Sequence, residues 1–170
     1  MHCNILSLKG VASSVALAAA ALALAQPASA QVTKIQSNPA ALILDAADVK
    51  AGTDMIFLSG QLASPVAPAA AGATPEFGDT KTQTISVLSK IKTILEARGY
   101  TMADLIKLTL FVAADPALGK MDFTGANEGF KTFFKTADNP TTVARSTFQV
   151  SALVAPQFLI EIEAIAAKKR

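Results

Sequence analysis

The C-terminal stretch from Ala144 to Ala166 constrains the fold most, because it is typical of two β-strands joined by a short loop. In each strand the side chains should alternate between two faces, with the two-residue period of a pleated strand. In the first strand, one face is expected to carry Arg145 and Thr147, and the other, which contains Phe148, is expected to lie in the core. The pattern therefore predicts a β-sheet with charged residues set into it.

The second strand of this stretch contains two carboxylates, Glu161 and Glu163, among aliphatic neighbours. A plain solvent face would instead carry lysine, threonine and serine. If the loop between the strands has an odd number of residues, Arg145 shares a face with both glutamates. A guanidinium and a carboxylate on one concave, partly apolar surface could bind a small carboxylated molecule and supply an acid–base group beside it. The alternative is a structural ion pair, worth about 0 to 1 kcal/mol when exposed.

Residues 1–30 have the pattern of a secretory signal peptide. Lys9 precedes an apolar run over residues 11–25, and Pro27 and the small residues 28–30 follow it. A run of about fifteen residues is shorter than the roughly 20 that a membrane-spanning helix needs, so a membrane anchor is the weaker interpretation. We therefore expect cleavage after Ala30, export to the periplasm or the medium, and one domain over residues 31–170.

Cleavage at this point would change the chemical inventory of the chain. The only histidine and the only cysteine, His2 and Cys3, leave with the signal, and the chain has no tryptophan. A Ser-His-Asp triad, a thiol nucleophile, a disulfide and a zinc site of the usual His/Cys type are then excluded. Lys9 is the only charged residue removed, so the net charge falls from +2 to +1. This balance gives no sign of a nucleic-acid or anionic membrane partner, and any ligand is expected to be small.

The remaining periodicities predict an alternation of strands and helices. The expected elements are strands at residues 48–50 and 55–61, a loop over 62–74, a helix over about 80–98 that ends at Gly99, a strand over 104–113 and a helix over about 121–136. This order predicts an α+β fold, a two-layer sandwich with two helices on one face of a mixed sheet. The uncovered face is too apolar for water and predicts an oligomer; it is expected to carry Phe57, Phe111, Thr147 and Leu159.

Two further polar features are candidate ligand contacts. Ser59, Gly60 and Gln61 end a predicted strand and offer a hydroxyl, an unobstructed backbone N–H and an amide, although a strand giving way to a loop explains them equally well. Asn127 lies on the aromatic stripe of the second predicted helix, together with Phe123, Phe130 and Phe134. A buried amide must find hydrogen-bond partners, and these could belong either to a ligand or to neighbouring backbone.

Taken together, these segments resemble the RidA family of reactive-intermediate deaminases, also called the YjgF family. The resemblance runs from about Pro39 to Ala167. It rests on the IFLSGQ strand, the segment GDTKTQTISVLSKIKTILEARGYTMADLIKLTLFV, the DFTGANEGFKTFF helix, the ARST strand start and the EIEAIA ending.

The resemblance implies a chorismate-mutase-like fold and a homotrimer, with clefts between subunits where Arg145 binds a substrate carboxylate. Family members hydrolyse enamines and imines derived from amino acids to 2-oxo acids and ammonia, without a metal or coenzyme. The implied activity is therefore a cofactor-free deaminase of the 2-iminobutanoate/2-iminopropanoate type. Glu161 falls on the carboxylate thought to help activate water. The family's binding positions fall on Ser59, Asn127 and the backbone about Gly60 and Thr147.

A departure from the family pattern keeps a second function open. The family's active deaminases usually have a tyrosine in a Gly-Pro-Tyr context before the first long strand, and here that region is LILDAADVK. The proline that usually precedes Ala-Arg-Ser is Val143 here. The alternative is an exported trimer that holds small carboxylates without turning them over. Arg145, Asn127 and Glu161 favour the enzyme, and the missing tyrosine favours the binding protein.

Overall fold

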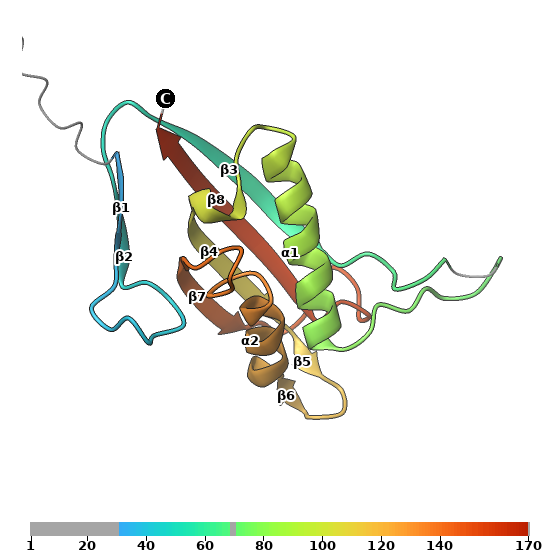
Figure 1. Ribbon diagram of the computed structural model, residues 1–170. Helices are drawn as coiled ribbons and strands as arrows, with labels where there is room; N and C mark the ends of the chain where they lie inside the picture. Colours follow the sequence, from blue (N-terminus) through green and yellow to red (C-terminus); the bar gives the residue numbers. More distant parts are fainter. Residues whose placement is uncertain (1–30, 69–70, 170) are drawn as a thin grey trace, which may run out of the picture.

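The computed structural model describes residues 31–68 and 71–169, and the predicted signal peptide lies outside this part of the chain. The elements are β1 (Val32–Ile35), β2 (Ala46–Val49), β3 (Thr53–Leu62), α1 (Thr80–Glu96), the 3₁₀ turn η1 (Met102–Asp104), β4 (Leu105–Val112), β5 (Ala114–Asp115), β6 (Lys120–Met121), α2 (Phe123–Lys131), β7 (Ala144–Gln149) and β8 (Ile160–Lys169). Figure 1 shows α1 and α2 together over one face of the main sheet. Within the described ranges, no helix is both long and apolar enough to cross a membrane.

The main sheet has four strands in the order β3-β8-β4-β7. β8 is antiparallel to both β3 and β4, whereas β7 is parallel to β4. A parallel pair needs a crossover connection, and α2 supplies it between β4 and β7. The α+β fold with two helices on one face of a mixed sheet is therefore confirmed.

The ends of α1 follow from local signals in the sequence. The side chain of Asp79 accepts a hydrogen bond of 2.8 Å from the backbone N–H of Thr82, which satisfies one of the free donors at the helix start. Beyond the other end, Gly99 has φ +72°, a left-handed conformation that favours glycine. The inward stripe of the helix, which includes Leu88, Ile91 and Leu95, is fully buried against the sheet.

The second helix is shorter than the sequence predicts. α2 begins after Asp122, whose side chain accepts from the N–H of Gly125 at 2.8 Å, and it ends at Lys131 rather than near residue 136. After the helix, the backbone N–H groups of Thr132 and Phe133 donate to the carbonyl oxygens three residues earlier, and Lys135 adopts φ +59°. The predicted aromatic stripe still continues, because Phe134 is fully buried and its ring lies 4.3 Å from that of Phe130.

The strands β1 and β2 form a separate ladder beside the main sheet. Lys34 of β1 connects this ladder to the rest of the fold, because its ammonium group donates hydrogen bonds to the carbonyl oxygens of Ala103 at 2.7 Å and Thr142 at 3.0 Å. Burial lowers the pKa of Lys34 to about 8. The backbone N–H of Leu44 donates to the carbonyl oxygen of Val143 at 3.1 Å, so the segment before β2 lies beside the start of β7.

The two faces of β7 are the reverse of those predicted from the sequence. Arg145 pairs with Leu108 and Thr147 with Leu110, and both leucines are fully buried under the helices. Phe148, expected in the core, is 53% exposed on the opposite face. The cause is the crossover through α2, which packs on the side of β7 that carries Arg145.

The uncovered sheet face is only partly as predicted. Phe57, which is 71% exposed, and Phe111 lie on it, as expected. Thr147 instead faces the helices, and Leu159 is buried just before β8 begins. Glu161 pairs with Phe111 across the sheet, so the uncovered face combines aromatic rings with a carboxylate.

Candidate functional site

Arg145 lies in a cradle of side chains from α2. One terminal nitrogen, Nη2, donates to Oδ1 of Asn127 at 2.6 Å. The central guanidinium carbon lies 4.6 Å from the ring centre of Phe130 and 5.9 Å from that of Phe123. Positions 123, 127 and 130 share one side of the helix because residues three and four apart are neighbours on a helix surface. The sequence placed these three residues on one stripe but did not place the two rings at Arg145.

The guanidinium of Arg145 is only partly satisfied. Its Nε and Nη1 atoms are buried and have no hydrogen-bond partner among the described residues. Burial lowers the pKa of Arg145, but a guanidinium in a protein still keeps its proton. An unpaired buried donor costs about 1 to 3 kcal/mol, and more when it is charged. A carboxylate can accept two parallel N–H bonds from a guanidinium, so Arg145 is suited to hold one.

Thr147 lies two residues further along β7, on the same side as Arg145. Its hydroxyl oxygen is also buried without a partner in the described part of the chain. Asn127, Arg145 and Thr147 therefore form one polar group on the helix side of the edge strand β7.

A second polar group lies on the uncovered face, where β3 meets β8. The pairing of these strands is irregular between Leu58 and Gln61, so Ser59 and Gly60 lie in a bulge opposite the start of β8. A Cβ atom built on Gly60 would lie only 1.8 Å from Oε1 of Glu161. Bulges often redirect side chains at functional sites. Here the bulge and the missing Cβ together leave room for the Glu161 carboxylate.

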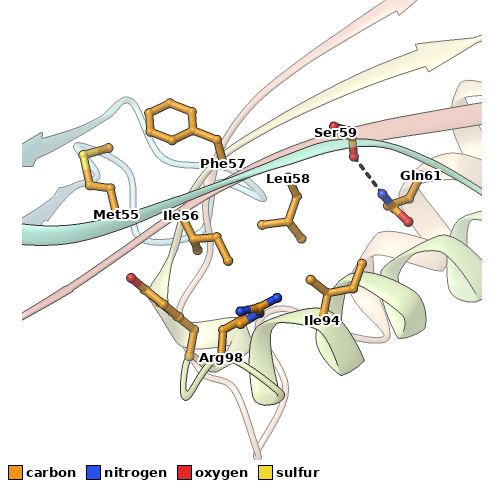
Figure 2. Close-up of a pocket in the computed structure, with 9 residues that line it drawn as sticks. Met55, Ile56, Phe57, Leu58, Ser59, Gln61, Ile94 and Arg98 are labelled. Atoms are coloured by element: carbon orange, nitrogen blue, oxygen red, sulfur yellow. Dashed lines mark hydrogen bonds between the residues drawn. The ribbon is translucent and has the colours of Figure 1, made fainter.

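Two cavities border this second group. One, of about 390 Å³, is lined by Phe111, Glu161, Glu163 and residues 150 and 152–154. The other, of about 540 Å³, is an open cavity that follows β3 from Met55 to Gln61 and is bordered by Ile94 of α1 and by Arg98 and Tyr100 after it. Figure 2 shows Ser59 and Gln61 at one end of the second cavity, joined by a 3.0 Å hydrogen bond from the amide to the Ser59 carbonyl.

The two polar groups do not converge within one chain. Arg145 lies on β7 at one edge of the sheet, and Gly60 on β3 at the other, with β8 and β4 between them. Glu161 and Glu163 lie on the face opposite to Arg145. The predicted shared face is therefore wrong, and so is the alternative of an ion pair. The ion pairs among the described residues involve other side chains.

The acidic residues do not suggest a metal centre. Among the described residues, no three or more histidine, cysteine, aspartate or glutamate side chains are grouped so that they could hold a metal ion. The segment LILDAADVK contains no tyrosine, and it packs through the buried Leu44 beside β7. It therefore brings a leucine, and no phenol, to the start of β7.

The similarity to known proteins extends over nearly the whole described chain. The family model described as Endoribonuclease L-PSP matches residues 45–168, more than half of the sequence. The 2-iminobutanoate/2-iminopropanoate deaminase of Escherichia coli K12 is 37% identical over 116 residues, which cover 68% of this chain and 81% of the relative.

Solved structures agree with the fold described above. A Rid-family protein from Yersinia pestis, of unknown function, aligns with a TM-score of 0.60 at 26% identity, over 81% of this chain and 99% of that one. Escherichia coli TdcF, solved with bound serine, aligns with a TM-score of 0.53 at 34% identity, over 81% of this chain and all of that one (100%). The chain therefore belongs to the RidA/YjgF family.

Proposed function

We propose that this protein hydrolyses 2-imino acids, and their enamine tautomers, to 2-oxo acids and ammonia. The observation that carries the proposal is the buried Arg145 guanidinium beside Asn127, two of whose nitrogens, Nε and Nη1, have no hydrogen-bond partner among the described residues. A 2-imino acid brings the carboxylate that these donors lack. The similar deaminase from Escherichia coli supports the reaction, and the serine bound to TdcF shows that a similar protein holds a small carboxylated molecule.

We further propose that the complete site forms between two copies of the chain. Arg145 and Glu161 lie on opposite faces of one sheet, so a single copy cannot place both on one substrate. Placing the β7 edge of one copy against the β3–β8 region of the next would bring Arg145 near the partner's Ser59, Gly60 and Glu161. Such a head-to-tail contact closes into a ring when the rotation per copy allows it, and the family resemblance implies three copies.

The reaction needs only groups that this chain supplies. Arg145 fixes the substrate carboxylate, and Glu161 orients a water molecule and accepts its proton as the oxygen bonds to the imine carbon. The electron pair of the C=N bond moves to nitrogen, which takes up the proton that Glu161 accepted from water. In the resulting carbinolamine the O–H proton passes to the amino nitrogen, and the C–N bond breaks as the C=O bond forms, so that ammonia leaves. Neither a metal ion nor a coenzyme takes part in this proposed sequence.

An ammonia-release assay tests the proposed function. An amino-acid oxidase generates the 2-imino acid in place, and ammonia is followed with and without the protein. We expect faster release with the protein than with buffer or heat-treated protein. If the protein binds a 2-oxo acid but does not speed ammonia release, the enzyme hypothesis is refuted. The protein would then be a carboxylate-binding protein, the alternative that the absence of a family-type tyrosine favours.

The proposed assembly gives a separate prediction. The uncovered face exposes large side chains that include Met55, Phe57 and Phe148, and exposed apolar patches of this kind mark interaction surfaces. We expect light scattering at micromolar protein to give three times the mass of one mature chain. A charge in the patch, as in Phe57→Glu, should weaken the assembly, whereas the exposed Leu118→Glu in the β5–β6 turn should not. A wild-type protein with the mass of one chain would refute the trimer.

We also propose that the protein is exported and cleaved after Ala30. Mass spectrometry of protein from its native compartment should give a chain that begins with Gln31 or its pyroglutamate. Replacing the small residue before the cleavage point, as in Ala30→Arg, should leave the leader attached. A wild-type chain that still carries Met1 would contradict export by this route.

A further inference from the structure

Gln83 is a fully buried polar residue on α1, and its hydrogen bonds join the helix to the turn just before it and to the loop that leads into β8. Its Nε2 donates to the carbonyl oxygen of Gly78 at 3.0 Å and to that of Gln157 at 2.9 Å. Its Oε1 accepts from the backbone N–H of Leu159 at 2.9 Å. Both amide hydrogens and the carbonyl oxygen are therefore used, and a side chain without both donors and an acceptor cannot make the three bonds.

These bonds hold the loop that leads into β8. Figure 1 shows this loop beside the first turn of α1. Gln83 makes hydrogen bonds to the backbone of Gln157 and Leu159, on either side of Phe158. The ring of Phe158 packs edge to face against that of Phe77, with the ring centroids 4.8 Å apart. The carbonyl oxygen of Leu159 accepts from Ala113 at 2.9 Å, so both backbone groups of Leu159 are fixed.

The held segment ends two residues before Glu161. Ile160 pairs with Val112 and Glu161 with Phe111, so the anchored Leu159 precedes the first paired rows of β8. The same loop, through residues 150 and 152–154, lines the cavity of about 390 Å³ that contains Glu161. Only Ile160 therefore separates the residue that Gln83 holds from Glu161, and the loop that Gln83 holds also forms part of the wall of the Glu161 cavity.

We propose that Gln83 is a positioning residue for imine hydrolysis, which fixes the entry of β8 and thereby the place of the Glu161 carboxylate. The inference rests on the proposed function. Gln83 belongs to the helix side of the sheet, away from the Glu161 carboxylate, and acts through the loop backbone. It should therefore affect the rate of the chemical step and leave the Arg145 group, on another strand, unchanged.

The experiment compares Gln83→Met and Gln83→Glu with Thr84→Val and the wild type. Thr84 is also fully buried on α1, but its hydroxyl donates within the helix to the Thr80 carbonyl oxygen, so it is a matched control. We expect Gln83→Met to lower kcat by about tenfold or more, since small misplacements of a catalytic group are costly. KM and the Kd for a 2-oxo acid should stay within about twofold of wild type, because Arg145 makes that contact. Thr84→Val should keep wild-type kcat.

Gln83→Glu adds a signature that loss of stability alone would not give. A carboxylate cannot donate to the two carbonyl oxygens, but a protonated carboxyl group regains one donor. Its activity relative to wild type should therefore rise as the pH is lowered from about 8 to about 6, because burial near acceptors raises a carboxyl pKa. The relative activity of Gln83→Met should stay flat.

Each outcome decides the inference. Wild-type kcat in folded Gln83 variants overturns it, as does a loss of 2-oxo acid affinity that accompanies the loss of kcat. If neither Gln83 variant folds, the residue is structural and the inference also fails. A wild-type protein without any turnover refutes the proposed function itself, which distinguishes that failure from a failure at Gln83.

Discussion

Replacing Arg145 should lower both imine hydrolysis and 2-oxo acid binding strongly while the protein stays folded. A charge-assisted hydrogen bond contributes about 1.5 to 3 kcal/mol, so losing the guanidinium should lower affinity and turnover by at least about tenfold. Lysine cannot reproduce the planar fork, so Arg145→Lys should fail together with Arg145→Ala. Calorimetry with a 2-oxo acid and the ammonia-release assay measure the two effects.

The fold should tolerate these changes because Arg145 contributes little net stability. Within the described part of the chain its side chain donates one hydrogen bond, to Asn127, while Nε and Nη1 are buried without partners. Arg145→Met would keep apolar contact with Phe130 and is the matched control for folding. We expect trimers with melting temperatures within a few degrees of wild type. Unchanged 2-oxo acid affinity in a well-folded Arg145→Ala protein would remove the basis for this site, and loss of the trimer would assign Arg145 a structural role.

The parts of the fold that depend on neighbouring residues could be predicted from the sequence. Asp79 caps α1 and Gly99 follows its end because both signals act within one turn of the helix. The alternation along β4 has the same local origin. The early end of α2 could not be predicted in this way, since Lys135 adopts a left-handed conformation that non-glycine residues rarely use.

The relation between β7 and β8 could not be predicted because it depends on strand order. The two strands follow each other along the chain, but β4 lies between them in the sheet. A shift of one residue in register exchanges the two faces of a strand, so which face Arg145 occupies depends on a partner that periodicity does not identify. The crossover through α2 fixes that partner as β4.

The candidate site was predicted as a set of residue types but not as an arrangement. Asn127 and Arg145 are in direct contact, and Gly60 lies against Glu161, so the residues form two pairs. Neither pair has a local sequence signal, because 18 residues separate the first and about a hundred the second. The separation of the pairs on opposite faces is what makes assembly part of the proposed chemistry.

The second pair leads to a further expected result: Gly60→Ala should lower kcat by about tenfold or more while changing stability little. The new methyl group would lie 1.8 Å from Oε1 and 2.7 Å from Cδ of Glu161, so the carboxylate must move. The displaced atoms belong to the end of a flexible side chain, and alanine also restricts the unfolded chain, so the free energy of unfolding should change by less than about 1 kcal/mol. Steady-state kinetics and a thermal melt check the two quantities.

A double-mutant cycle with Glu161→Gln shows whether the methyl group acts through Glu161. Glu161→Gln alone should keep 2-oxo acid binding, which Arg145 provides, and lose rate because an amide cannot accept the proton from water. If Gly60→Ala only displaces this carboxylate, adding it to Glu161→Gln should cause little further loss of kcat, and the two effects will be strongly non-additive. Gly129→Ala, which would crowd the contact between α1 and α2 at Thr84, is the control for a steric change elsewhere and should combine additively. Additive losses for Gly60→Ala and Glu161→Gln would mean that Gly60 serves the reaction by another route, such as its backbone N–H.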